Sequence, residues 1–126
     1  MKGFVTNIEQ DSLNNANFRQ VLFTAPHSQL VVMSLKAGED IGMEVHEKED
    51  QFIRVEQGSG KAVLNGEESE LQNGSAVVIP AGTEHNIINA EDREMKLYTI
   101  YSPAHHPDGT IHPTKADAQA AEKAKE

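Results

Sequence analysis

The chain has 126 residues, enough for one domain that buries about two thirds of the surface its unfolded form exposes. Its formal charge of -9, from 20 acidic and 11 basic residues, and the lack of a basic cluster exclude nucleic acid and an anionic membrane surface as partners. Because the sequence contains no cysteine, any metal must be bound by histidine, carboxylate or amide groups.

The N-terminal stretch, residues 1–18, is polar and rich in asparagine. Without a clear hydrophobic period it predicts a loosely structured lead-in. It lacks the apolar segment of a secretory signal, and no run of residues approaches membrane-spanning length. These features predict a cytoplasmic protein without a membrane partner.

Residues 19–102 consist of short runs rich in β-branched and aromatic residues, separated by Gly, Pro, Asn and Asp. The runs are RQVLFT, LVVMSL, IGMEVH, QFIRVEQ, KAVL, SELQ, AVVIP, HNIIN and MKLYTIY. Many short strands with turn residues between them predict an all-β sandwich or barrel. Asn65 and Gly66 supply the two positive φ angles of a type I′ hairpin turn. Gly58 and Gly60 indicate a bend or bulge that a Cβ would obstruct.

Residues 103–126 predict an irregular loop followed by a short C-terminal helix. Thr114 and Asp117 have the spacing of a capping box, and Pro113 precedes them. The apolar face of this helix is only alanine. It is therefore either a solvated, fraying end or an element that docks on a partner subunit.

The C-terminal loop contains three histidines, His105, His106 and His112. Three histidines in one segment suggest a second metal site. However, the surrounding Pro and Gly residues predict an irregular loop in which the histidines are exposed to solvent. In an intermediate hypothesis the loop is a lid across the barrel mouth, where His105 or His106 carries a proton near the functional site.

Two strands and a later loop carry candidate metal ligands. Glu44 and His46 alternate along one strand, so their side chains share a face. If the next strand pairs antiparallel across the acidic turn at 47–50, Gln51 lies on that face as well. His85 begins a later apolar strand. Two imidazoles, a carboxylate and an amide can bind Fe, Mn, Ni or Zn, whereas the alternative is a metal-free cluster held by hydrogen bonds.

The spacing of these residues resembles the two signature motifs of the cupins, which are small β-barrel proteins. The second motif, G-x5-P-x-G-x2-H-x3-N, is matched in full at Gly74, Pro80, Gly82, His85 and Asn89. The first motif, G-x5-H-x-H-x3or4-E-x6-G, is matched in spacing at Gly38, Glu44, His46, Gln51 and Gly58. Glu replaces its first His and Gln replaces its Glu, so one carboxylate remains in the set.

The resemblance implies a cupin jelly-roll β-barrel over residues 19–102, with a divalent metal bound by Glu44, His46, Gln51 and His85. It extends to the broad group labelled mannose-6-phosphate-isomerase-like. However, no Lys or Arg pair is clearly placed inside the barrel to hold a phosphate. Cupin barrels often pair through their sheets, and an exposed apolar strand such as LVVMSL would be better covered by a partner, so we expect a homodimer.

Three functions are compatible with this site and with a small-molecule ligand in the barrel. In the first, a divalent cation (Zn, Ni, Mn or Fe) polarises a sugar or keto acid in an isomerase- or lyase-type reaction. The second is an Fe(II)-dependent dioxygenase that uses Glu44, His46 and His85. The third is a binding protein without turnover. Tyr101 is a candidate proton carrier because we expect it inside the barrel, with Lys96 outside.

Overall fold

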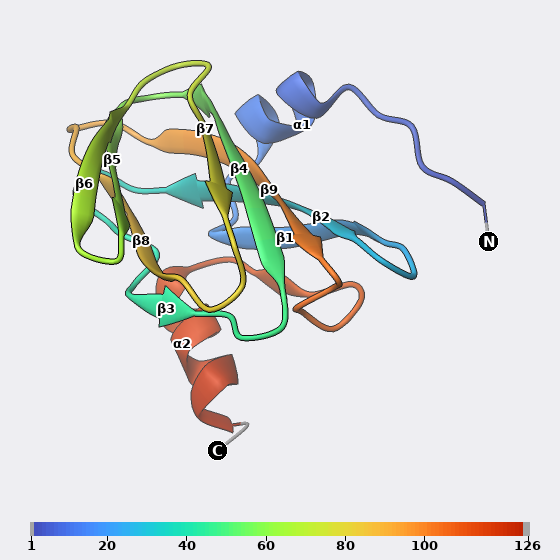
Figure 1. The fold of residues 1–126 in the computed structure, drawn as a ribbon. Coiled ribbons are helices and arrows are strands. Elements are labelled where there is room, and N and C mark those ends of the chain that lie inside the picture. The colour runs from blue at the N-terminus through green and yellow to red at the C-terminus, as the bar shows by residue number, and fades with distance from the viewer. Residues whose placement is uncertain (1, 125–126) are drawn as a thin grey trace.

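The computed structural model describes residues 2–124, which form two antiparallel β-sheets packed face to face (Figure 1). The strand order is β10-β1-β2-β9-β4-β7 in one sheet and β3-β8-β5-β6 in the other. The elements are α1 (Ile8–Asn14), β1 (Arg19–Thr24), β2 (Gln29–Leu35), β3 (Glu44–Val45), β4 (Asp50–Gln57), β5 (Gly60–Leu64), β6 (Glu67–Leu71), β7 (Ala76–Ile79), β8 (Glu84–Asn89), β9 (Met95–Ser102), β10 (Ile111–His112) and α2 (Lys115–Ala124). This jelly-roll arrangement with a short C-terminal helix confirms the predicted all-β fold class.

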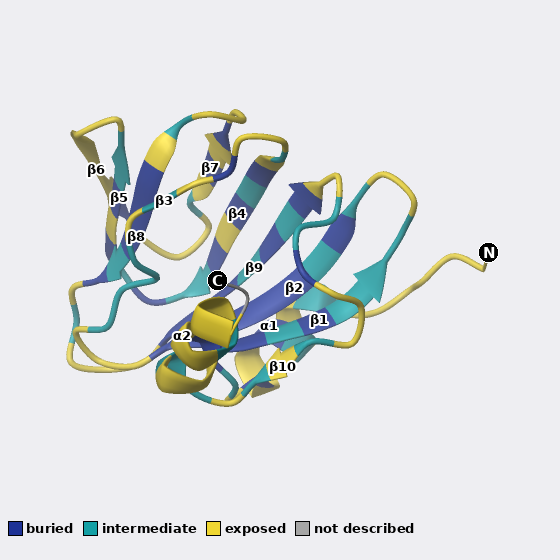
Figure 2. Ribbon diagram, turned by 90° about the horizontal axis from the view of Figure 1, so that it is seen from below, coloured by how far each residue is buried: buried dark blue, intermediate teal, exposed yellow. Residues whose placement is uncertain are grey.

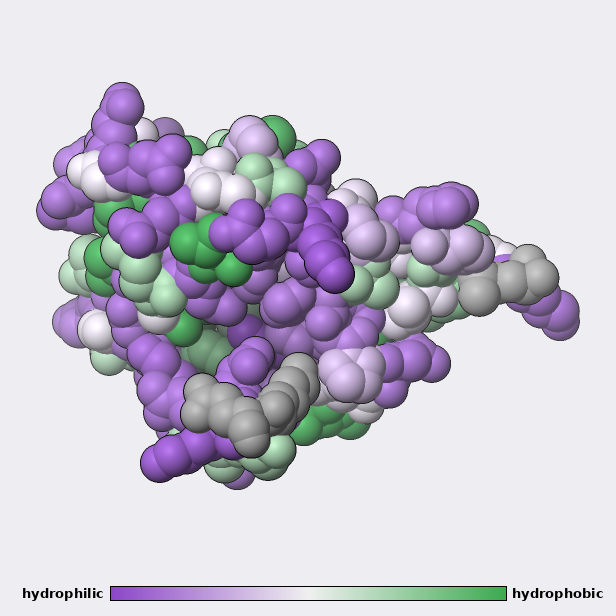
Figure 3. Space-filling model, turned by 60° about the horizontal axis from the view of Figure 1, so that its bottom comes forward, coloured by the Kyte–Doolittle hydropathy of each residue, from purple (hydrophilic) through white to green (hydrophobic). Residues whose placement is uncertain are grey.

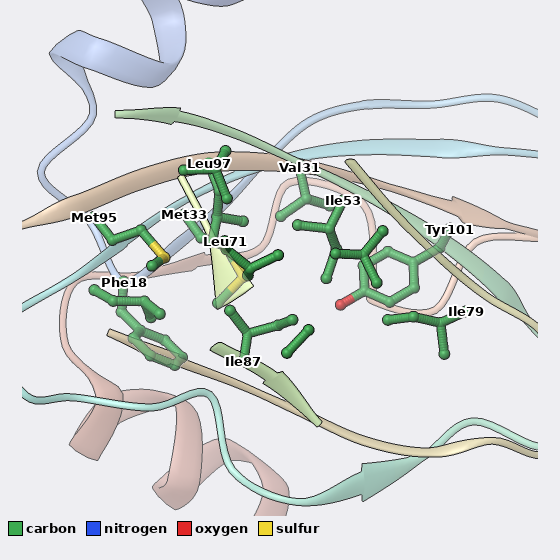
Figure 4. Close-up of a cluster of buried hydrophobic side chains, with 14 of the residues drawn as sticks. Phe18, Val31, Met33, Ile53, Leu71, Ile79, Ile87, Met95, Leu97 and Tyr101 are labelled. Atoms are coloured by element: carbon green, nitrogen blue, oxygen red, sulfur yellow. The ribbon is translucent and has the colours of Figure 1, made fainter. Parts of the chain in front are cut away.

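The core lies between the two sheets because alternate strand residues point inward. On β4 the side chains of Ile53 and Val55 are buried, whereas Arg54 between them is exposed. The same alternation on β9 buries Leu97 and Tyr101, as predicted. The core side chains labelled in Figure 4 are Phe18, Val31, Met33, Ile53, Leu71, Ile79, Ile87, Met95, Leu97 and Tyr101.

The hairpin between β5 and β6 turns at Asn65 and Gly66, as the sequence predicted. Both residues have positive φ angles, 49° and 82°. Leu64 and Glu67 are directly paired on either side of the turn. The two-residue loop with two positive φ angles confirms the type I′ assignment.

The N-terminal segment contains a helix, α1, so the expected loosely structured lead-in was wrong for these residues. The side chain of Asn7 caps the helix by accepting a hydrogen bond from the amide of Gln10 at 3.0 Å. The helix packs against β2, β4 and β9, and Ser12 is fully buried there. A helix of seven residues has little stability of its own, so packing on the sheet is what stabilises it.

The segment around α1 also explains the burial of Lys96, which points away from the barrel interior as predicted. Its ammonium group donates hydrogen bonds to the carbonyl of Asn15 at 2.5 Å and to Ser34 Oγ at 3.1 Å, and pairs with Glu94 at 2.7 Å. Three partners satisfy the donors of the ammonium group. The outer face of β9 is therefore closed by the chain itself at this point.

Strand β2 is central in its sheet rather than exposed. It pairs with β1 on one side and β9 on the other, and most of its residues are buried on both faces. The argument that the LVVMSL strand needs a partner subunit to cover it was therefore wrong. The homodimer remains a prediction that no longer depends on this strand.

The C-terminal helix α2 begins with the predicted capping box. The amide of Asp117 donates to Thr114 Oγ1 at 3.1 Å, and the amide of Thr114 donates to the Asp117 carboxylate at 3.2 Å. The helix packs on the barrel of its own chain (Figure 2). Its Ala118 is buried. Neither helix in the described range, residues 2–124, is long and apolar enough to span a membrane.

Replacement of Gly60 by alanine is expected to destabilise the barrel. A Cβ at this position would lie 2.0 Å from the carbonyl oxygen of Ile88 and 2.7 Å from Met95 Cε. We expect Gly60→Ala to lower the free energy of unfolding by about 2–3 kcal/mol in a urea titration, the upper range for overpacking. Gly3→Ala is the control, because a Cβ there meets nothing within 4 Å. Equal stability of the two variants would contradict this packing.

Candidate functional site

The structure brings the predicted ligands together, but the strands that carry them pair differently from the expected arrangement. Strand β3 pairs with β8, and β4 pairs with β7 and β9. The antiparallel pairing assumed across residues 47–50 was therefore wrong, because β3 and β4 belong to opposing sheets. Glu44 lies directly opposite His85 in the β3–β8 ladder. Gln51 is buried on the inner face of the other sheet.

His46 lies at the centre of this cluster and is 6% exposed. Its ring centroid is 5.1 Å from that of His85. Its Nε2 atom is 3.7 Å from the carboxylate of Glu44. The two histidines that are far apart in the sequence therefore lie close together inside the barrel.

His105 joins the cluster from the C-terminal loop. Its ring centroid is 4.1 Å from that of His46. The ligand atoms of Glu44, His46 and His105 all lie within 4.8 Å of one another, and this is the group with metal-ligand spacing found in residues 2–124. His85 is not a member of this group. The position of His105 matches the lid hypothesis rather than solvent exposure, although nothing in its spacing along the sequence indicated a ligand.

The other two loop histidines serve different contacts. His106 is buried, with its Nε2 3.4 Å from the hydroxyl of Tyr101. His112 lies on β10, where its Nδ1 is 3.4 Å from Arg19. The rings of His105 and His106 lie close together, with centroids 4.7 Å apart. His112 is instead beside Arg19, and among the described residues the three histidines do not form a group with metal-ligand spacing.

Hydrogen bonds orient two of the imidazoles in the cluster. Nδ1 of His85 is 2.9 Å from the carbonyl oxygen of Thr83, and Nδ1 of His105 is 3.0 Å from the carboxylate of Glu49. Each acceptor favours a proton on Nδ1, which leaves a lone pair on Nε2. Metal-binding histidines in proteins are commonly oriented in this way.

Two buried polar atoms in the cluster have no hydrogen-bond partner. They are Nε2 of His46 and Oε1 of Gln51. The amide nitrogen of Gln51 donates to Thr99 Oγ1 at 3.0 Å, which fixes the amide and leaves its oxygen as the free end. Buried polar atoms without a partner are costly. A cation would give each of them one, so the residues fit a divalent metal.

The protonation state of His46 also suits a cation. Burial lowers the pKa of His46 to about 4, and the nearby charges of His105 and His85 act in the same direction. His46 is therefore neutral near pH 7 and keeps a lone pair. Burial raises the pKa of Glu44, against the charge of Arg19, which lowers it. Burial likewise raises the pKa of Tyr101, so its hydroxyl keeps its proton.

A pocket of about 660 Å³ opens beside the cluster. One side is formed by residues 41–46 and another by α2, with Phe18, Arg19 and His105 also lining it. Figure 3 views the molecule from the end where α2 lies, and a recessed hydrophobic surface is visible there among hydrophilic side chains. Glu44, His46 and His105, which line this pocket, are therefore reachable by a small molecule.

Comparison with known proteins shows which family has this arrangement. Residues 31–101 match the family model described as a cupin domain. The chain belongs to the cupin family. It is 48% identical over 127 residues to the uncharacterized protein YrkC of Bacillus subtilis, covering 96% of this chain and 68% of that protein. It is 49% identical over 113 residues to the uncharacterized protein L612 of Acanthamoeba polyphaga mimivirus, covering 86% and 70%.

A crystal structure shares the fold of this cupin closely. It is that of BH2720 from Bacillus halodurans, which is 45% identical, with a TM-score of 0.93 over 94% of this chain and 95% of that one. These matches confirm the cupin resemblance. They do not select the mannose-6-phosphate-isomerase-like group within it.

The second cupin motif acts mainly through the backbone. The amide of Gly82 donates to the carbonyl oxygen of His46 at 2.9 Å, which ties the turn of the second motif to the ligand strand of the first. Gly82 has a φ of 85°, a conformation that favours glycine. The side chain of Asn89 donates to the carbonyls of Leu35, Lys36 and Arg93 at 2.8–3.2 Å. This motif therefore positions the site, and only His85 contributes a candidate ligand.

Helix α2 is held against this cupin barrel by an ion pair. Lys115 Nζ is 2.5 Å from Asp40, which also accepts a hydrogen bond from Asn86 Nδ2 at 2.8 Å. Asn86 in turn accepts from the amide of Gly42 at 2.9 Å. The hydrogen bonds from Lys115 and Asn86 lower the pKa of Asp40.

Asp40→Asn is expected to destabilise the protein in a pH-dependent way. Because the pKa of Asp40 is lower in the folded state, its contribution is complete above the ordinary value of 3.8 and is lost as the pH falls through the folded value. We expect a loss of about 0.5–1 kcal/mol at pH 7 and at pH 5, the range for a partly exposed pair. The difference should shrink only at lower pH, so urea unfolding of both proteins from neutral pH to below the ordinary value of 3.8 measures it.

The matched control for this prediction is Asp92→Asn, at an exposed position. Its effect on the free energy of unfolding is expected to be small throughout. A difference between wild type and Asp40→Asn that stays constant down to the lowest accessible pH would argue against the ion pair as the attachment of α2.

Proposed function

We propose that this cupin binds a divalent cation between Glu44, His46 and His105, with His85 and Gln51 completing the donor set. The observation that supports this most directly is the buried Nε2 of His46, which has no hydrogen-bond partner and lies 3.7 Å from the Glu44 carboxylate. Imidazole, carboxylate and amide donors together suit Zn, Ni, Mn or Fe.

The proposed activity is an isomerase- or lyase-type reaction on a small oxygenated metabolite, such as a sugar or keto acid. A bound cation supplies a Lewis acid that polarises a carbonyl or carboxylate oxygen. A pocket of about 660 Å³ is the size of ordinary small-molecule sites. Glu44, His46 and His105 line it.

The chain also offers groups that hold or move a proton beside the proposed cation. The contact of His105 Nδ1 with the Glu49 carboxylate orients its ring as a ligand, so the proton carrier must be another residue. Tyr101 keeps its proton and contacts His106, which makes its hydroxyl a hydrogen-bond donor. In this proposal Glu44 is a metal ligand rather than the base.

An Fe(II)-dependent dioxygenase is the second candidate function. It is favoured by the composition of the cluster, because Glu44, His46 and His105 provide two histidines and one carboxylate, the set that non-haem iron oxygenases use. Oxygen consumption by the iron-loaded protein distinguishes this reaction from isomerase or lyase chemistry. A metal-loaded protein that turns over no metabolite would instead be a binding cupin.

Metal content measured by elemental analysis tests the proposed cation site. The protein purified without added metal is expected to contain about one divalent ion per chain. His46→Ala is expected to lose it, because this histidine is the central donor and truncation leaves no substitute. Chelator should lower the melting temperature of the wild type, since a ligand bound only to the folded state stabilises it.

Metal content and affinity also distinguish the contributions of the remaining donors. His105→Ala and His85→Ala are each expected to reduce metal affinity by at least about tenfold, the scale of losing an important contact at a metal site. Gln51→Ala should weaken it less, because a neutral amide is replaced. His27→Ala, at an exposed position, is the control. Wild-type metal content in His46→Ala would refute the site.

A further inference from the structure

Arg19 is a buried cation without an anionic partner. It is 5% exposed, and its Nε has no hydrogen-bond partner. Its NH1 lies 3.4 Å from His112 Nδ1, and its guanidinium carbon lies 5.3 Å from the Phe18 ring centroid. None of the ion pairs in residues 2–124 includes it. A buried charge normally has an opposite charge beside it, so this one is unusual.

The place of Arg19 in the fold connects it with the metal-ligand cluster. It is the first residue of β1, where it pairs with His112 of β10 and its side chain lines the same pocket as Glu44, His46 and His105. The positive charge of Arg19 lowers the pKa of Glu44, second in size only to the opposite effect of burial. Arg19 is therefore close enough to act on whatever occupies the site.

The other cations of the pocket are differently placed. Lys115 is neutralised by Asp40 at 2.5 Å, and Lys123 is exposed near the end of α2. Arg19 is thus the one buried cation among the described pocket residues that no carboxylate neutralises. A guanidinium presents a planar fork of donors that matches a carboxylate in geometry as well as charge.

We propose that Arg19 binds the carboxylate of a small organic acid in this pocket, with the acid's carbonyl or hydroxyl group directed toward Glu44, His46 and His105. This inference rests on the proposed function and narrows its substrate class from oxygenated metabolites to α-keto or α-hydroxy acids. It assigns to Arg19 the role of binding and orienting the substrate.

A carboxylate fits this pocket better than a phosphate, the other oxyanion that a guanidinium binds. A phosphate dianion is usually held by several cations or backbone amides, and here a single unpaired guanidinium is available. Two amides at the start of α2, those of Thr114 and Asp117, are occupied by its capping box. The carboxylates of Glu44 and Glu122 also line the pocket and oppose additional negative charge.

Binding of pyruvate to the zinc-loaded protein tests the proposal. Dissociation constants are measured by NMR titration at constant ionic strength, with dihydroxyacetone as the neutral carbonyl compound and inorganic phosphate as the alternative oxyanion. We expect pyruvate to bind the wild type more tightly than either. Equal affinity for dihydroxyacetone and pyruvate, or tighter binding of phosphate, would overturn the proposal without any variant being needed.

Substitution of Arg19 then locates the interaction. Arg19→Gln is expected to weaken pyruvate binding about 10- to 100-fold, the size expected for loss of a charge-assisted hydrogen bond, and to leave dihydroxyacetone binding unchanged. Arg19→Lys keeps the charge without the fork and should show an intermediate loss. Arg54→Gln removes an exposed arginine on the outer face of β4 and is the control. Wild-type affinity for pyruvate in Arg19→Gln would contradict the proposal.

The outcomes for Arg19 and for the metal are distinguishable. Metal content of Arg19→Gln should equal that of the wild type, because Arg19 is not in the donor set. If the protein binds no metal but pyruvate binding still depends on Arg19, the carboxylate site is supported and the cation site is refuted. If metal binds normally and the affinity for pyruvate is unchanged in Arg19→Gln, the carboxylate site is refuted and the cation site is supported.

Discussion

The burial of His46 between two opposing sheets is the constraint on which the site depends. An imidazole in this position cannot be hydrated, so burial holds it neutral, with a pKa of about 4. Its backbone carbonyl is fixed by the amide of Gly82, and its Nε2 faces the Glu44 carboxylate. A shift of either sheet would separate Glu44 and His85, which come from paired strands, from Gln51 on the facing sheet.

Much of this arrangement could be predicted from the sequence, because it follows from the two-residue period of β-strands. The alternation of Glu44 and His46, and of Ile53 and Val55, determined which side chains point inward whatever strand they pair with. The pairing itself was predicted wrongly. A short acidic turn resembles a hairpin connection, but here the chain crosses from one sheet to the other, and only packing of the whole barrel distinguishes the two.

The residues that sequence analysis missed share a different property, since their roles depend on contacts distant along the chain. His105 was placed near the site only as a proton carrier in one hypothesis, because it belongs to an irregular loop without a period and no pattern indicates a ligand there. Arg19 begins β1 and looks like a polar strand end until β10 is paired beside it. The α1 segment has too few apolar residues for a helical signal, and its stability comes from the sheet that it covers.

The charge of the protein surface differs from that of the pocket. The protein is strongly acidic overall, with a formal charge of -9, and such a surface repels polyanions at long range. Inside the pocket the balance is locally reversed, because Arg19 has no carboxylate partner and the histidines and Glu44 together would bind a cation. Helix α2 separates these two environments, with its buried Ala118 small enough to let the helix lie close to the barrel while its polar residues line the entrance. Under the proposal that Arg19 binds a carboxylate, a small monoanion is attracted once inside the pocket, and net charge and size are the first determinants of selectivity.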